Sequence, residues 1–376
     1  MRRPGSVLHA SAVIALFSAA LAAAASAQEV APQAAIIDTI IIERDNVFNE
    51  EEAASSGIFR FMNKIHVTTK EFVIRDYLQF EAGEPLDSAS VEETERQLRL
   101  RRLFRELTTD TVRLEDGRLA VKVHSQDGWS LKPKFKFSIA STGDWTGTFG
   151  VNEINLLGTG NQVYAAYVKE LDRDGLNASA LFTRIFSWNF DAGGNYAGLS
   201  DGRNGNWLVG LPFRNTESSK SYQWDGLWAD QDIIQYRVTD IPDSVVTDTT
   251  TYRRDAFVNT LKAGLAGRHL VGNYVRWGAD VGIRQEEFYL DPSARGTAPD
   301  SIYGHVSVWS EFSRAKFVQF RRFNGFGTED IDLSSTVKLT ATLAPETFGW
   351  NGTGVGLGLN AATGISRVIS GEGWVW

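Results

Sequence analysis

The chain has 376 residues, among them 22 Phe, 11 Trp, 10 Tyr, 35 Gly and no Cys. This balance is too aromatic and too rich in Gly for a disordered chain, and too polar for a bundle of membrane helices. The lack of Cys excludes disulfide scaffolds, thiol nucleophiles and Cys-ligated metal centres, and a net charge of −8 argues against a nucleic-acid-binding surface.

The N-terminal segment has the pattern of an export signal. Arg2 and Arg3 precede a short apolar run at residues 13–17, and Ala25-Ser26-Ala27 is a small-x-small cleavage pattern before Gln28. These features predict a signal peptide over residues 1–27, rather than a membrane anchor. No other stretch approaches the roughly 18 apolar residues of a spanning helix. We therefore expect a mature chain that is either soluble outside the cytoplasm or crosses a membrane as strands.

Residues 34–127 have the pattern of a small α+β domain. Residues 36–44 are short and β-branched, which predicts a strand. Two helices are predicted after it, over residues 68–80 and residues 90–104. The first would be opened by the capping box Thr-Thr-Lys-Glu and the second by Ser-x-x-Glu.

A hairpin is predicted to complete this domain. Residues 107–114 and residues 119–124 flank Asp116-Gly117, a dipeptide typical of tight hairpin turns. The predicted order is therefore β-α-α-β-β. The Arg residues of the second helix fit a solvated helix face better than an anion site.

The sequence changes character near Gly128, because all 11 Trp lie at or after Trp129. From there to residue 376 the dominant period is two, as in strands with one apolar face. About 12 candidate strands are present, with an uncertain stretch at residues 220–255. The first strand shows the pattern: Trp129, Leu131, Phe135, Phe137 and Ile139 alternate with Ser130, Lys132, Lys134, Lys136 and Ser138.

Three features favour a transmembrane barrel over a soluble sandwich for residues 129–376. The candidate strands have about 10 residues, which matches a tilted membrane span. Aromatic residues flank them as interfacial girdles do, and short turns mix with longer polar loops. An open sheet in lipid would leave backbone groups unpaired, so the barrel must close. The side chains predicted to face its lumen include Lys132, Lys134, Lys136, Arg276 and Arg284.

The two regions together resemble the outer-membrane assembly-factor superfamily, also called the bacterial surface antigen family. Its members carry periplasmic POTRA (polypeptide-transport-associated) domains before a C-terminal barrel. The segments that resemble a POTRA domain are residues 63–69, 74–76, 80–87, 92–99 and 103–104. Gly147-Thr148-Phe149-Gly150, followed by Asn155-Leu156-Leu157-Gly158-Thr159-Gly160-Asn161, resembles the first hairpin of the family's barrel.

Two departures from the family pattern predict an incomplete barrel. The family barrel has 16 strands, and 248 residues with long loops are too few for that number. The barrel region also lacks the Arg-Gly-Tyr or Arg-Gly-Phe motif of a late loop. The last residues, Gly371 to Trp376, only partly match a barrel-terminal signal. We favour a chain truncated before its last strands over a complete small barrel.

Enzyme motifs are lacking in this sequence. Five His are scattered, and no HExxH, P-loop or Gly-x-Ser-x-Gly pattern occurs. The acidic clusters at residues 50–52 and 329–332 lack the spacing of a calcium loop and are interpreted as polar loops. We therefore expect no enzymatic activity, no cofactor and no metal site.

The resemblance implies a role in inserting or translocating proteins, or lipids, at the bacterial outer membrane, with the N-terminal domain in the periplasm. The implied partners are outer-membrane lipid, unfolded outer-membrane or secreted protein clients, and periplasmic accessory proteins. A client would pair by β-augmentation with a strand edge. The alternatives are a passive channel with a periplasmic adaptor domain, whose lumen residues set ion selectivity, and a structural anchor. The strand expected to pair with clients carries Leu107, Thr109, Thr111 and Arg113.

Overall fold

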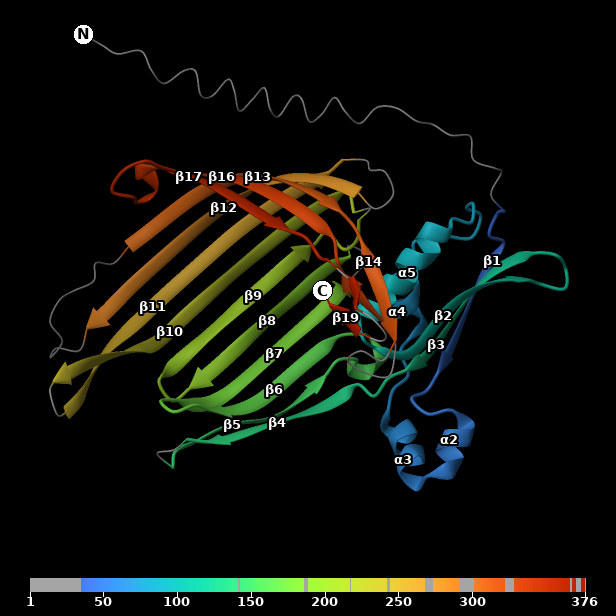
Figure 1. The fold of residues 1–376 in the computed structure, drawn as a ribbon, viewed down its shortest axis with the longest axis horizontal. Coiled ribbons are helices and arrows are strands. Elements are labelled where there is room, and N and C mark those ends of the chain that lie inside the picture. The colour runs from blue at the N-terminus through green and yellow to red at the C-terminus, as the bar shows by residue number, and fades with distance from the viewer. Residues whose placement is uncertain are drawn as a thin grey trace, which may run out of the picture.

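The computed structural model contains a sheet of three strands and a sheet of twelve strands, which lie end to end, and two small hairpin sheets (Figure 1). The predicted signal peptide lies outside the described residues, as does the polar stretch at residues 291–300, which the sequence pattern predicts to be a loop. No helix in the described part of the chain is long and apolar enough to cross a membrane. The described residues are 35–140, 143–185, 189–216, 218–241, 244–267, 273–290, 301–321, 328–365, 367–369 and 373–375.

We call residues 35–127 the N-terminal module. Its sheet has the order β1-β3-β2, in which β1 runs parallel to the central strand β3 and β2 runs antiparallel to it. Four helices lie between β1 and β2 along the chain. The elements are β1 (Thr39–Asp45), α2 (Glu50–Ser55), α3 (Gly57–Ile65), α4 (Glu71–Arg75), α5 (Ser88–Leu100), β2 (Phe104–Arg113) and β3 (Leu119–Asp127).

The core of the module lies between its helices and its sheet. Ile74 and Leu98 bring the apolar sides of α4 and α5 onto Val121 and Val123 of β3, and all four side chains are fully buried. Alternate residues of β3 therefore cover one face of the sheet with apolar side chains. The predicted hairpin is also present, with Gly117 at a φ of 83° in its turn.

Both predicted helix starts are wrong. The first helix is only α4, whose N-cap Lys70 makes no side-chain capping bond, because an ammonium group cannot accept from a backbone amide. The second helix begins earlier than predicted, at Ser88. The carboxylate of Asp87 caps it by accepting from two backbone amides of its first turn, which satisfies those orphan donors.

The polar stretch after β1 is not a loop but the helices α2 and α3. Asn49 and Glu52 form a reciprocal capping box at the start of α2, and the Ser56 hydroxyl caps α3. The Asn-x-x-Glu spacing is itself a sequence signal for a helix start. The module therefore has two more helices than the sequence pattern predicts.

Twelve strands between residues 131 and 362 form one antiparallel sheet, which matches the predicted number of about 12. Its strands are longer than expected where the sequence pattern is uncertain, since β10 has 22 residues and β11 has 23. The strands are β4 (Leu131–Ile139), β5 (Trp145–Glu153), β6 (Gln162–Lys169), β7 (Asp174–Ile185), β8 (Phe190–Leu199), β9 (Gly202–Leu211), β10 (Lys220–Ile241), β11 (Ser244–Ala266), β12 (Asn273–Leu290), β13 (Ser301–Arg314), β16 (Ser335–Ala344) and β17 (Gly354–Ala362).

Short segments lie between and after these strands. The hairpin of β14 (Phe317–Arg321) and β15 (Thr328–Asp332) separates β13 from β16 and forms a sheet of its own. The sequence pattern did not separate this insertion from the strands around it. A second small hairpin, β18 (Arg367–Ile369) with β19 (Gly373–Val375), follows β17.

The register divides the large sheet into an apolar face and a polar face. On the apolar face, Phe135 lies opposite Phe149, and Val281 lies opposite both Leu261 and Val306. Large apolar side chains on this face are exposed, up to 75% for Phe135 and 85% for Leu357. Along β4 the other face carries the charged residues, whereas in β9, β10 and β11 the register also puts Arg203, Asp230 and Asp255 on the apolar face. The alternation that the sequence shows is therefore present in the register of the sheet.

The sheet is curved but open among the described residues (Figure 1). The strand order runs from β17 at one edge to β4 at the other, and these two strands do not pair with each other there. A barrel in lipid must be closed. The part of the chain that the structure describes does not form a closed barrel.

Candidate functional site

The free edges of the large sheet are its first candidate surface. Each residue of β4 and of β17 is exposed. Within the described ranges, β4 pairs only with β5, and β17 pairs only with β16. The unpaired N–H and C=O groups of such an edge can accept another strand. These two edges are therefore chemically competent to extend the sheet.

The second candidate surface is the edge of the module formed by β2. The backbone N–H of Thr109 donates to Glu95 Oε1 at 2.7 Å, so it points away from β3. Alternation along an antiparallel strand places the N–H groups of Leu107, Thr111 and Arg113 on the same outer edge. Glu95 of α5 thus covers the middle of this edge, whereas Thr111 and Arg113 form an exposed end.

The module is docked on the large sheet through the turn between β5 and β6. The backbone N–H of Lys70 donates to the carbonyl of Gly158 at 2.8 Å, and Asn155 Nδ2 donates to Thr69 Oγ1 at 2.8 Å. Asn155 also accepts from the backbone of Gly160 within its own turn. The Asn-Leu-Leu-Gly-Thr-Gly segment therefore has a physical role in this chain, which is to bind the module.

A buried carboxylate supports this docking turn from the module side. Asp127, the last residue of β3, is fully buried. Its Oδ2 accepts from the backbone N–H of Thr69 at 2.7 Å and lies 2.8 Å from His66 Nε2. These bonds tie the end of α3 and the start of α4 to the strand that leads into the large sheet.

Residues after α4 contact the nearby strand ends of the large sheet. The guanidinium of Arg184 lies over the Tyr77 ring, 4.2 Å from its centroid, and Asn215 Nδ2 donates to Gln79 Oε1 at 2.6 Å. Burial raises the pKa of Asp76, and the opposing fields of Arg184 and of Arg214 only partly offset this effect. Burial therefore makes the ionised form of Asp76 less favourable than it is in water, and the two guanidinium groups act in the opposite direction.

The β14–β15 hairpin holds α5 from another side. Arg99 donates to both oxygens of Asp330, at 2.7 and 3.2 Å, and also to Glu95 at 2.9 Å. The two side chains are nearly buried, with exposed fractions of 9% for Arg99 and 2% for Asp330. The guanidinium of Arg96 lies 4.0 Å from the centroid of the Phe317 ring. Asp330, interpreted from sequence as part of a polar loop, is thus an interface residue.

The five predicted lumen residues all lie on the polar face. Following the register strand by strand places Lys132, Lys134 and Lys136 of β4 on the face that also holds Arg276 and Arg284 of β12. Their surroundings differ. Arg284 pairs with a neighbouring carboxylate at 2.6 Å, whereas Arg276 is buried and donates to the backbone of the β9–β10 connection.

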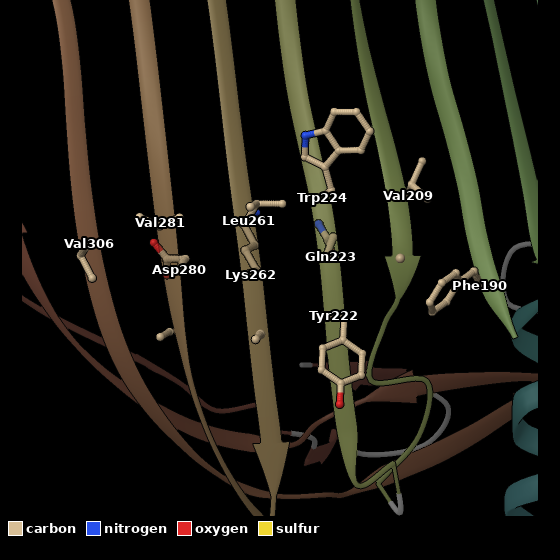
Figure 2. Close-up of a pocket in the computed structure, with 13 residues that line it drawn as sticks. Phe190, Val209, Tyr222, Gln223, Trp224, Leu261, Lys262, Asp280, Val281 and Val306 are labelled. Atoms are coloured by element: carbon tan, nitrogen blue, oxygen red, sulfur yellow. The ribbon is translucent and has the colours of Figure 1, made fainter. Parts of the chain in front are cut away.

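A shallow pocket of about 460 Å³ lies on the sheet between β9 and β13. Figure 2 shows aromatic and aliphatic side chains around it, among them Trp224, Tyr222 and Leu261. The register assigns these side chains to the apolar face. Such a lining suits apolar chains and supplies no arrangement of nucleophile and base.

Among the described residues, no group of three or more His, Asp or Glu side chains is placed to hold a metal ion. The expectation that the protein has no metal, no cofactor and no enzymatic activity stays a prediction.

Comparisons with known proteins do not identify a function for these surfaces. No family model and no curated protein matches the chain. Among solved structures, the chain is similar to that of BamA from Haemophilus ducreyi lacking POTRA domains 1–3, with 8% identity and a TM-score of 0.41. The similarity covers 88% of this chain and 82% of that one. At this identity and TM-score the similarity carries no argument about function, so the function is inferred from the surfaces described above.

Proposed function

We propose that this protein is an outer-membrane assembly or translocation factor that acts without covalent chemistry. The observation that carries the proposal is a large sheet with one apolar face, two edges that are unpaired among the described residues, and a second sheet docked at one end. The apolar face would meet lipid, and the N-terminal module, acting as a POTRA-like domain of residues 34–127, would lie in the periplasm. Residues 1–27 would direct export and be removed.

A client strand would first pair with the module and then with the large sheet. The open end of the β2 edge offers backbone groups to an extended segment by β-augmentation. Beyond it, β4 offers the backbone groups of its outer edge, since its other edge pairs with β5. The clients would be unfolded outer-membrane or secreted proteins, and periplasmic accessory proteins would assist delivery.

The membrane placement can be tested on the strand whose two faces differ most. Phe137 on the apolar face would meet lipid, where an added charge costs about 2–4 kcal/mol near the midplane. Phe137→Arg should therefore block stable membrane assembly, whereas Lys136→Ser on the polar face should be tolerated. Alkaline extraction of membranes measures both. Wild-type protein released into the supernatant would exclude the transmembrane arrangement.

Client pairing can be tested by cysteine trapping, since the chain contains no Cys. A single Lys134→Cys on β4 should form a disulfide with a Cys placed in a strand of an arriving outer-membrane client. The matched control is Asn195→Cys on β8, a strand paired on both sides. Equal trapping at both positions, or none at either, would argue against an edge that receives clients.

A passive channel is the second candidate, because the polar face carries the basic residues of β4. In that case, replacing Lys132, Lys134 and Lys136 with Ser would shift the anion–cation preference of the conductance in planar bilayers. A selectivity that does not change, together with intact client trapping, would favour the assembly role.

A further inference from the structure

Helix α3 presents three large apolar side chains to solvent. Ile58, Phe61 and Ile65 are 69%, 59% and 51% exposed. Their spacing of three and four residues places them on one side of the helix. The opposite side packs inward, where Phe59 stacks on Phe48 at a centroid distance of 4.2 Å. The exposed stripe is therefore not needed for the internal packing of the module.

A basic residue lies beside this stripe. Lys64 is exposed about a quarter of a turn from the middle of the stripe, whereas Arg60 lies farther round the helix and its guanidinium donates to the backbone carbonyl of Ala54. Long basic side chains beside an apolar stripe can extend to phosphate groups while their stems stay in the apolar layer. A short amphipathic helix of this kind suits the surface of a lipid leaflet.

The apolar stripe continues toward the large sheet. Directly after α3, Val67 is 44% exposed and lies beside the docking turn, 3.2 Å from where a Cβ on Gly158 would be. Leu157 in that turn is 65% exposed. Leu131, also exposed, begins the apolar face of β4. Exposed apolar groups thus run from α3 to the module end of the apolar face.

We propose that α3 is an interfacial anchor that lies on the inner leaflet surface of the membrane spanned by the large sheet. Ile58, Phe61 and Ile65 enter the boundary between headgroups and acyl chains, and Lys64 at the flank of the stripe binds a lipid phosphate. This inference rests on the proposed membrane placement. It assigns a lipid contact to the N-terminal module and sets the tilt of the module against the membrane.

Site-specific fluorescence on the full chain tests the anchor. Single variants Phe61→Cys and Glu115→Cys are labelled with the environment-sensitive dye NBD in a chain that has no other Cys. The protein is reconstituted into phosphatidylethanolamine–phosphatidylglycerol vesicles. Glu115 is the matched control, because it is exposed in the turn between β2 and β3, which projects away from the large sheet in Figure 1.

The expected result is a blue-shifted emission at position 61, with quenching by lipids that carry a doxyl group near the headgroup and little quenching by iodide. Position 115 should show the reverse. If iodide quenches both positions equally, the anchor is wrong. Protection at position 61 in native membranes but not in the purified vesicles would also overturn it, because a protein partner would then be the occupant.

A third label separates this inference from the proposal on which it rests. Val281→Cys lies on the apolar face of β12 and should be quenched by lipids with a doxyl group deep in the acyl chain. If position 281 is quenched and position 61 is not, only the anchor fails. If position 281 is also open to iodide, the membrane placement fails and the anchor fails with it.

Discussion

The ion pair between Arg99 and Asp330 should hold the β14–β15 hairpin on α5, and Asp330→Ala tests it. Loss of one partner of a buried pair costs about 3–5 kcal/mol, because it leaves an uncompensated charge. In this case Glu95 still accepts from Arg99, which retains part of the compensation. We therefore expect a cost of about 2–3 kcal/mol for the closed arrangement of the hairpin.

Hydrogen exchange of the hairpin amides measures this cost directly. If the hairpin opens locally, 2–3 kcal/mol corresponds to exchange that is about 30- to 140-fold faster. The control Gln319→Ala alters an exposed side chain on β14 and should leave exchange unchanged. The double variant Arg99→Met with Asp330→Leu should recover most of the protection, since an apolar pair can replace a buried ion pair at little cost. Exchange of Asp330→Ala within about twofold of wild type would refute this reasoning.

Three further predictions concern the module and its docking. Gly158→Ala should weaken docking by about 1–2 kcal/mol or more, because φ is +72° there and the new Cβ would lie 2.5 Å from the Thr68 carbonyl oxygen. Faster proteolysis of the linker between the two sheets would measure the weaker docking. Leu98→Asp should unfold the module, because an unpaired charge at a fully buried position costs several kcal/mol, and an unchanged melting temperature would contradict the core described above. The raised pKa of Asp76 predicts stability that is fully present below the ordinary value of 3.8 and is lost as the pH rises through the folded-state pKa. Asp76→Asn should flatten that part of the pH profile of melting, and a profile identical to that of wild type would show that another group titrates there.

The sequence predicts most reliably the features that depend on local periodicity. Alternation places Phe135 and Lys134 on opposite faces of β4, and the Asp-Gly turn is sufficient to predict the hairpin of β2 and β3. The helix starts fail because residues outside the predicted boxes occupy the cap positions. Thr68 and Glu71 have the spacing of a capping box, but the N-cap of α4 is Lys70, and the carboxylate of Asp87 caps α5 ahead of Ser90.

The candidate surfaces depend on contacts that a sequence alone does not show. Arg99 and Asp330 are separated by 231 positions along the chain, and neither lies in a pattern that distinguishes an interface from a solvated face. The helices α2 and α3 are a different kind of omission. Their signal, the Asn49–Glu52 capping box, is present in the sequence and follows the same rule as the boxes that were predicted.

The junction between the two sheets has mechanical consequences. β3 ends at Asp127 and β4 starts at Leu131, and the residues between them are fastened, since Gly128 donates to the Leu103 carbonyl at 2.7 Å and Ser130 accepts from Ile154. These hydrogen bonds hold the short connection in a single conformation. A rotation of the module would therefore move β4 together with the β5–β6 turn to which the module is bound, and so would displace the strand edge at which a client is proposed to pair.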